Sequence, residues 1–128
     1  IVVIGSVAAH RPLPDMPAYS ASKAALRAWA TAIRGRLAPQ GVGVTIVSPG
    51  FVTSAMSRRH LGIKPFEIGA EAAASKILRG LERGDALITF PWQLSTLAWL
   101  GSRLPPRLSD LAIKGFATRI EPDRDRND

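Results

Sequence analysis

Three short apolar runs alternate with two longer segments of helical periodicity, and this order limits the folds open to the chain. The runs cover residues 1–5, 42–47 and 86–90, and their length and β-branched content are typical of buried parallel strands. Each segment between them is long enough to cross from one strand to the next as a helix. A strand, helix, strand, helix, strand order favours parallel pairing with right-handed crossovers. The sequence therefore predicts an α/β fold built on a parallel sheet.

The first crossover segment is predicted to be a helix that begins near Asp15 and ends near Leu37. Asp15 is expected to cap it, and Pro17 lies in its first turn, where a missing N–H costs little. One stripe of this helix steps by four and three residues in turn: Tyr19, Lys23, Leu26, Ala30, Ile33 and Leu37. Tyr19 and Lys23 thus begin the stripe that should face the sheet, a position better explained by a site than by packing.

Polar or turn-forming residues also follow the first two predicted strands. Ser6 ends the first run, and Pro49-Gly50 closes the second. In open α/β sheets ligands bind beyond the carboxyl ends of the strands, so these residues are expected to share a crevice with the start of the helix. A hydroxyl, a phenol and an ammonium are thereby brought together, and the ammonium of Lys23 favours the phenolate form of Tyr19. This combination suits proton transfer to or from an oxygen.

These residues carry a resemblance to a known family. The stretch IVVIGSVAAHRPLPDMPAYSASKAAL resembles the active-site segment of the short-chain dehydrogenase/reductases (SDR), in which a serine precedes a Tyr-x-x-x-Lys motif. SPGFVTSAM resembles their later Pro-Gly-x-x-Thr segment. The resemblance extends from Ile1 to Met56 and more loosely to Pro91. It implies the carboxyl-terminal half of a doubly wound, Rossmann-type parallel sheet, with the amino-terminal half, its glycine-rich turn and an upstream catalytic Asn absent.

The resemblance also implies a function. The enzyme would be an NAD(P)-dependent oxidoreductase that interconverts an alcohol and a carbonyl, and the 128-residue chain alone is expected to be inactive. Tyr19 would be the general acid/base, Ser6 would donate to the substrate oxygen, and Lys23 would bind the nicotinamide ribose. The family also implies a small-molecule substrate, a homo-oligomer, and a mobile substrate lid over residues 54–65.

The expected cofactor-binding residues lie in the two segments that carry the resemblance. They are Tyr19, Lys23, Pro49, Gly50, Val52 and Thr53. The Pro-Gly step would let the backbone approach the nicotinamide closely, and Thr53 matches the position that bonds its carboxamide. The alternative for Thr53 is a helix N-cap, which is compatible with that role. The residue that distinguishes NAD from NADP lies in the absent half, so the cofactor is predicted only as NAD or NADP.

The chain is predicted to divide at residue 91. Residues 1–91 would form the partial Rossmann-type catalytic domain, with a second helix over 67–83 that Gly84 ends. Residues 92–120 would form a helical extension, too short and too charged to span a bilayer, that packs on the domain or a partner. A membrane-surface contact through Trp92, Trp99 and nearby arginines is the alternative for this segment. Residues 121–128 are predicted to be a disordered tail.

Composition narrows the remaining function classes. The net charge is +7, but the arginines are spread over several segments and are not interleaved with aromatics, so nucleic-acid binding is not expected. No cysteine is present and no metal-ligand spacing occurs, and His10 and His60 are left out of the site. The protein is expected to be cytoplasmic. The alternative is a cytoplasmic protein that associates with a membrane. The rival hypothesis is a non-enzymatic binding module that acts through residues 92–120.

Overall fold

Three parallel strands form one sheet in the order β1-β2-β3. They are β1 (Val2–Ile4), β2 (Thr45–Pro49) and β3 (Leu87–Phe90). The computed structural model describes residues 1–58 and 62–113. The register pairs Val3 with Ile46 and Val47 with Ile88. The predicted parallel α/β architecture is confirmed.

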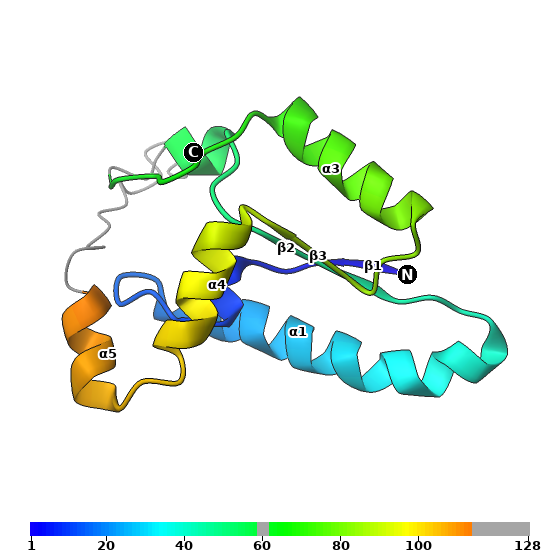
Figure 1. The fold of residues 1–128 in the computed structure, drawn as a ribbon, viewed down its shortest axis with the longest axis horizontal. Coiled ribbons are helices and arrows are strands. Elements are labelled where there is room, and N and C mark those ends of the chain that lie inside the picture. The colour runs from blue at the N-terminus through cyan, green and yellow to red at the C-terminus, as the bar shows by residue number, and fades with distance from the viewer. Residues whose placement is uncertain (59–61, 114–128) are drawn as a thin grey trace, which may run out of the picture.

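Two helices cover opposite faces of this sheet (Figure 1). These helices are α1 (Pro17–Leu37) and α3 (Ala70–Glu82). The core under α1 contains Val3, Ala30, Val44 and Ile46, against which Ile33 and Leu37 pack. The core under α3 contains Val47, Ala73, Ile88 and Phe90. The stripe predicted for the first helix therefore does face the sheet along its second half, where Ala30 is fully buried.

The beginning of α1 differs from the prediction. Met16, not Asp15, is the N-cap, and no side chain caps the helix there. The reason is Pro17, which lies in the first turn as predicted but occupies its first position, and which holds the preceding residue out of the helical conformation. Inside the first turn, the Ser20 hydroxyl instead accepts the N–H of Leu13 at 3.1 Å.

A strand and a helix both begin later than predicted, because backbone hydrogen bonds hold the residues before them in another conformation. The strand predicted from residue 42 begins at Thr45, since α1 continues into the 3-10 turn η2 (Ala38–Gln40) and the N–H of Val42 bonds back to Leu37 O at 3.2 Å. The helix predicted from residue 67 begins at Ala70, because Ile68 is held extended in an isolated bridge with Val52. Its end agrees with the prediction: Gly84 has a left-handed φ of 74°.

The carboxyl-terminal part, predicted to be a helical extension, contains two short helices. They are α4 (Trp92–Gly101) and α5 (Pro106–Ile113). Helix α4 packs against β3 and against the 3-10 turn η1 (Val7–Ala9), on the same side of the sheet as α1. No helix in the described part of the chain is both long and apolar enough to cross a bilayer. The predicted end of the extension, residues 114–120, and the tail 121–128 lie outside the described residues.

Candidate active site

Ser6 is held at the carboxyl end of β1 by backbone and side-chain bonds. The preceding residue, Gly5, donates its N–H to Val47 O at 2.7 Å, so the pairing of β1 with β2 continues up to Ser6. The Ser6 side chain is buried, and its Oγ accepts the N–H of Ala8 in η1 at 3.1 Å. A serine hydroxyl that accepts one hydrogen bond can still donate its proton. Its geometry therefore suits donation to a substrate oxygen.

Lys23 joins the tyrosine to the end of the same strand. Tyr19 lies in the first turn of α1 and Lys23 one turn later, and both side chains are half-buried. Lys23 Nζ donates to Ile4 O at 3.0 Å and lies 5.7 Å from the centroid of the Tyr19 ring, which is within the usual range of a cation–π contact. Ile4 is the last residue of β1, two before Ser6. The structure thus brings the ammonium to both the phenol ring and the strand that positions Ser6.

Pro49 and Gly50 lie at the end of the neighbouring strand, where helix α4 approaches. The N–H of Gly50 donates to Phe90 O at 2.7 Å. A Cβ atom at Gly50 would lie 2.9 Å from Pro91 Cδ and 3.1 Å from a methyl carbon of Leu94, closer than ordinary van der Waals contact. The glycine is therefore required by the packing of α4 on the strand end. Its close approach to a nicotinamide stays a prediction.

Val52 and Thr53 are held by the chain segment that leads into α3. Val52 forms the isolated bridge with Ile68, and Thr53 donates its N–H to Ile68 O at 2.9 Å. The exposed Thr53 hydroxyl contacts the same carbonyl at 3.4 Å. The short helix α2 (Ala55–Arg58) follows, and it is Ser54 Oγ that accepts a helix N–H, from Ser57 at 3.0 Å. The alternative of Thr53 as the N-cap is therefore wrong.

A layer of hydroxyls beneath the strand ends was not singled out from the sequence. Thr89 Oγ1 donates to Ser48 O at 3.2 Å and makes a second, short hydrogen bond with Ser95 Oγ of α4. Ser48 is fully buried, and its Oγ has no hydrogen-bond partner among the described residues. The available signal was a pair of hydroxyl residues: Ser48 directly follows the second apolar run, and Thr89 lies inside the third.

His10 adds a titratable group beside this region. It follows η1 and is half-buried. Burial first, and then the nearby guanidinium of Arg27, hold the pKa of His10 below its usual value. Within residues 1–58 and 62–113, no group of three or more His, Asp and Glu side chains could hold a metal ion.

This chain is similar to known proteins in both sequence and fold. A model of the short chain dehydrogenase family matches residues 1–61. An uncharacterized oxidoreductase of Myxococcus xanthus is 37% identical over 114 residues, which are 89% of this chain and 45% of that protein. A very-long-chain 3-oxoacyl-CoA reductase of Meyerozyma guilliermondii is 47% identical over 58 residues, which are 45% of this chain and 17% of that protein.

A solved structure extends the likeness to three dimensions. A short chain dehydrogenase from Burkholderia cenocepacia, in complex with NADP, has a TM-score of 0.72 and 29% identity, over 88% of this chain and 46% of that one. Because 88% of this chain is covered, the structural similarity extends beyond residue 61, where the match to the family model ends. The chain spans less than half the length of each of these relatives.

Proposed function

Because this chain belongs to the short-chain dehydrogenase family, we propose that it serves the NAD(P)-dependent interconversion of an alcohol and a carbonyl. The observation that carries the proposal is the position of Lys23, which bonds to Ile4 O at 3.0 Å and lies against the Tyr19 ring. This ammonium links the proposed acid/base to the strand that holds Ser6. A phenol, an ammonium and a hydroxyl, the groups that proton transfer to an oxygen requires, therefore lie at one end of the sheet.

The residues present fit the nicotinamide end of a dinucleotide. Lys23 has three N–H donors, and its bond to Ile4 O uses one of them, so the others are available for ribose hydroxyls. The exposed Thr53 hydroxyl lies past the end of the adjacent strand β2, where a carboxamide could be bonded. A glycine-rich turn for the pyrophosphate does not occur in this sequence. The bound dinucleotide would supply or accept the hydride.

The protein side of the reaction is a proton transfer at the substrate oxygen. In the reducing direction, the Tyr19 hydroxyl donates its proton to the oxygen that becomes the alcohol. The Ser6 hydroxyl donates a hydrogen bond to the same oxygen and stabilises the negative charge that develops there. The Lys23 ammonium, 5.7 Å from the centroid of the Tyr19 ring, lies beside this phenol and is placed to interact with the charge that the transfer leaves there.

The name of one relative indicates which substrates to test first. The Meyerozyma guilliermondii protein is a very-long-chain 3-oxoacyl-CoA reductase, so 3-oxoacyl thioesters of increasing chain length are suitable first probes for this protein. The Burkholderia cenocepacia structure contains NADP, so NADPH is the first cofactor to test and NADH the second. A homo-oligomer stays a prediction.

The test is turnover of the complete gene product before and after Tyr19→Phe. This change removes the phenolic proton but keeps the ring against Lys23. General acid/base catalysis contributes about 10²–10⁴-fold, so kcat should fall by that factor. The control is Trp29→Phe, which alters an exposed aromatic side chain on the same helix and should leave kcat unchanged. Near-normal turnover of Tyr19→Phe would remove this residue from the mechanism.

A second function, contact with a membrane surface, is favoured by the exposed apolar side chains of α4 and α5. Trp92 is 68% exposed and Leu111 67% exposed, and Arg103 lies 4.7 Å from the ring centroid of Trp99, so exposed apolar side chains and a cation lie together in this part of the chain. Sedimentation with anionic phospholipid vesicles tests this proposal. Trp99→Ser should release the protein, whereas Trp29→Ser, on α1, should not. Equal sedimentation of both variants would contradict it.

A further inference from the structure

The loop between η1 and α1 joins the proposed hydroxyl donor to the proposed acid/base, and hydrogen bonds hold it near both ends. Near its start, the N–H of His10 donates to Val7 O at 3.0 Å. Near its end, the N–H of Leu13 donates to the Ser20 hydroxyl of α1 at 3.1 Å. Each end of the loop is therefore bonded to the element that it adjoins.

The middle of this loop has a different support. No residue within 1–58 and 62–113 bonds to the backbone of Arg11 or Pro12, and a proline has no N–H to offer. Arg11 Nη2 instead donates to Asp110 Oδ1 of α5 at 3.5 Å. The Arg11 side chain is 22% exposed and that of Asp110 is 74% exposed, so most of the arginine lies against the protein. The loop is thus tied to a helix 99 residues later in the chain.

Asp110 is presented by a helix that is itself held in place. The preceding residue, Ser109, is buried, and its hydroxyl donates to the carbonyl of Gly101 at the end of α4, at 2.9 Å. The connection between the two helices contains Pro105 and Pro106, whose fixed φ angles limit its freedom. Pro105 O also accepts the N–H of Ser109 at 3.0 Å. Helix α5 is therefore fastened to α4.

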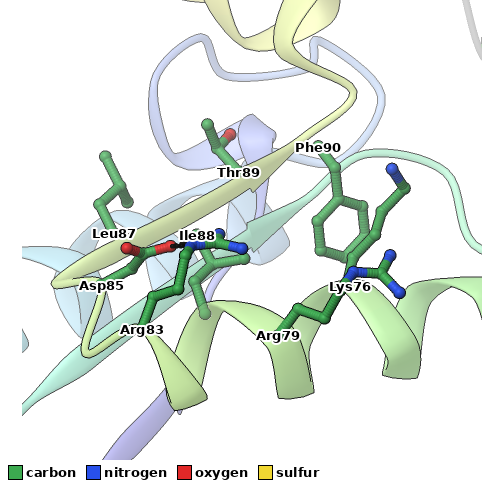
Figure 2. A pocket seen from close by; sticks show the side chains of 8 residues that line it. All are labelled: Lys76, Arg79, Arg83, Asp85, Leu87, Ile88, Thr89 and Phe90. Carbon is green, nitrogen blue, oxygen red and sulfur yellow. Dashed lines mark hydrogen bonds and ion pairs between the residues drawn. The ribbon is translucent and has the colours of Figure 1, made fainter.

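Helix α4 is in turn fastened to the sheet. Ser95 Oγ makes a short hydrogen bond with Thr89 Oγ1 of β3, and the Thr89 side chain points away from α3 (Figure 2). Helix α4 also packs against η1, the turn that follows Ser6. The helical extension therefore meets the chain after Ser6 at two places, through α4 at η1 and through Asp110 at Arg11.

We propose that Asp110 is a positioning residue of the active site, which acts through Arg11 to fix the loop between Ser6 and Tyr19. The inference rests on the proposed function for the roles of Ser6 and Tyr19. Both hydroxyls must reach the same substrate oxygen, so a loop that leaves this conformation aligns them for less of the time. A partly exposed ion pair contributes modestly, so its loss should change rates by a few-fold.

The first test follows amide hydrogen exchange at residue resolution in the purified complete gene product. The reporters are the N–H groups of Ala8 and Leu13, which donate to the serine hydroxyls on either side of the loop. In Asp110→Asn both should exchange about threefold to fivefold faster, the factor by which loss of such an ion pair shifts a local opening equilibrium. The control Glu82→Gln removes the same charge from an exposed position on α3 and should change both rates less than about twofold.

Exchange of the two charges separates the ion pair from packing. Arg11→Glu and Asp110→Arg each bring like charges together, so each should lower kcat at least about threefold with KM within about twofold of the wild type. The combined variant restores an ion pair and should return kcat and both amide exchange rates to within about twofold of the wild type.

Three results would overturn the proposal. They are unchanged exchange of both amides in Asp110→Asn, a combined variant as impaired as the single ones, and a rise in KM alone, which would assign Arg11 to substrate binding instead. The exchange rates do not depend on turnover. Absence of oxidoreductase activity in the wild type would therefore contradict the proposed function, while the exchange rates would still decide whether Asp110 holds the loop.

Discussion

The two faces of the sheet use their polar groups in opposite ways. On the face covered by α1 and α4, polar side chains bond to the chain itself: Lys23 to Ile4 O, Ser20 to the N–H of Leu13, and Thr89 to Ser48 O. On the face covered by α3, the centre is apolar apart from Thr45, whose hydroxyl donates to Asp85 O at 2.9 Å. The side chains of Lys76 and Arg79 stand at its rim (Figure 2) and make no such bond with a described residue.

This difference shows on which face of the sheet polar side chains are held in fixed positions. A buried polar group is costly unless it is hydrogen-bonded, so the internal bonds of the α1 face also fix the positions of the groups that make them. A proton-transfer site needs such fixed groups. Exposed cations remain solvated and are free to meet a ligand of opposite charge. We therefore expect the proposed proton transfer to take place on the first face.

The largest expected effect comes from replacing one lysine with methionine, first on one face of the sheet and then, as a control, on the other. Lys23→Met should lower kcat/KM at least about tenfold, because hydrogen bonds to a charged group are worth about 1.5–3 kcal/mol. Lys76→Met should change kcat/KM less than about twofold. Steady-state kinetics with the best substrate and with varied cofactor would measure both. A comparable loss in the two variants would abolish the distinction between the faces.

The next test concerns the hydroxyl layer on the α1 face. Thr89→Val removes the hydroxyl that bonds Ser48 O and leaves the buried Ser95 side chain without this partner, so it should lower the free energy of unfolding by about 1–3 kcal/mol. Ser48→Ala removes a buried Oγ that bonds no described residue and should not lower it, because no hydrogen bond to a described residue is lost. Urea unfolding measures both values. A larger loss for Ser48→Ala would show that its hydroxyl does have a partner.

The smallest expected effect is the pH response of His10. Burial and Arg27 lower the pKa of His10 in the folded protein, so below the ordinary value of about 6.5 the unfolded chain binds more protons than the folded one. Stability should therefore be unaffected by this group above pH 7 and should fall as the pH drops below that value. Melting temperatures of wild type and His10→Gln between pH 7 and pH 5 would show it. If the melting temperature of His10→Gln depended on pH as steeply as that of the wild type, the lowered pKa of His10 would not be the cause of the pH dependence.

The sequence was sufficient to predict the strands and the longer helices, but not the short helix α2 or the exact limits of the elements. The alternation of apolar runs and helical stripes predicted the parallel sheet, and Ala30 lies fully buried in the stripe that the spacing indicated. The start of β2 was misplaced because Val42 still bonds to Leu37 O, a local contact that apolar periodicity does not report. Asp15 was chosen as a cap for its side chain, whereas Pro17 decided where the helix begins.

For the candidate site, spacing predicted that Tyr19 and Lys23 share a helix face, and the motif placed Ser6 with them. The contact between Lys23 and Ile4 O joins a helix to a strand and could not be read from spacing alone. The intervals between Lys76, Arg79 and Arg83 also indicate one helix face in the sequence, but only the tertiary structure shows that these residues lie beside β3. The packing requirement at Gly50, set by Pro91 and Leu94, is likewise tertiary.

The bridge between Val52 and Ile68 has a consequence for how the molecule can be altered. The N–H of Thr53 bonds to Ile68 O at 2.9 Å and that of Ile68 to Phe51 O at 3.1 Å, so both ends of the intervening segment are tied together at its base. For a loop closed in this way, doubling the length costs only about 0.6 kcal/mol. Residues can therefore be inserted or exchanged between Thr53 and Ile68 while the sheet keeps its register, which makes this segment a natural place to graft new substrate specificity.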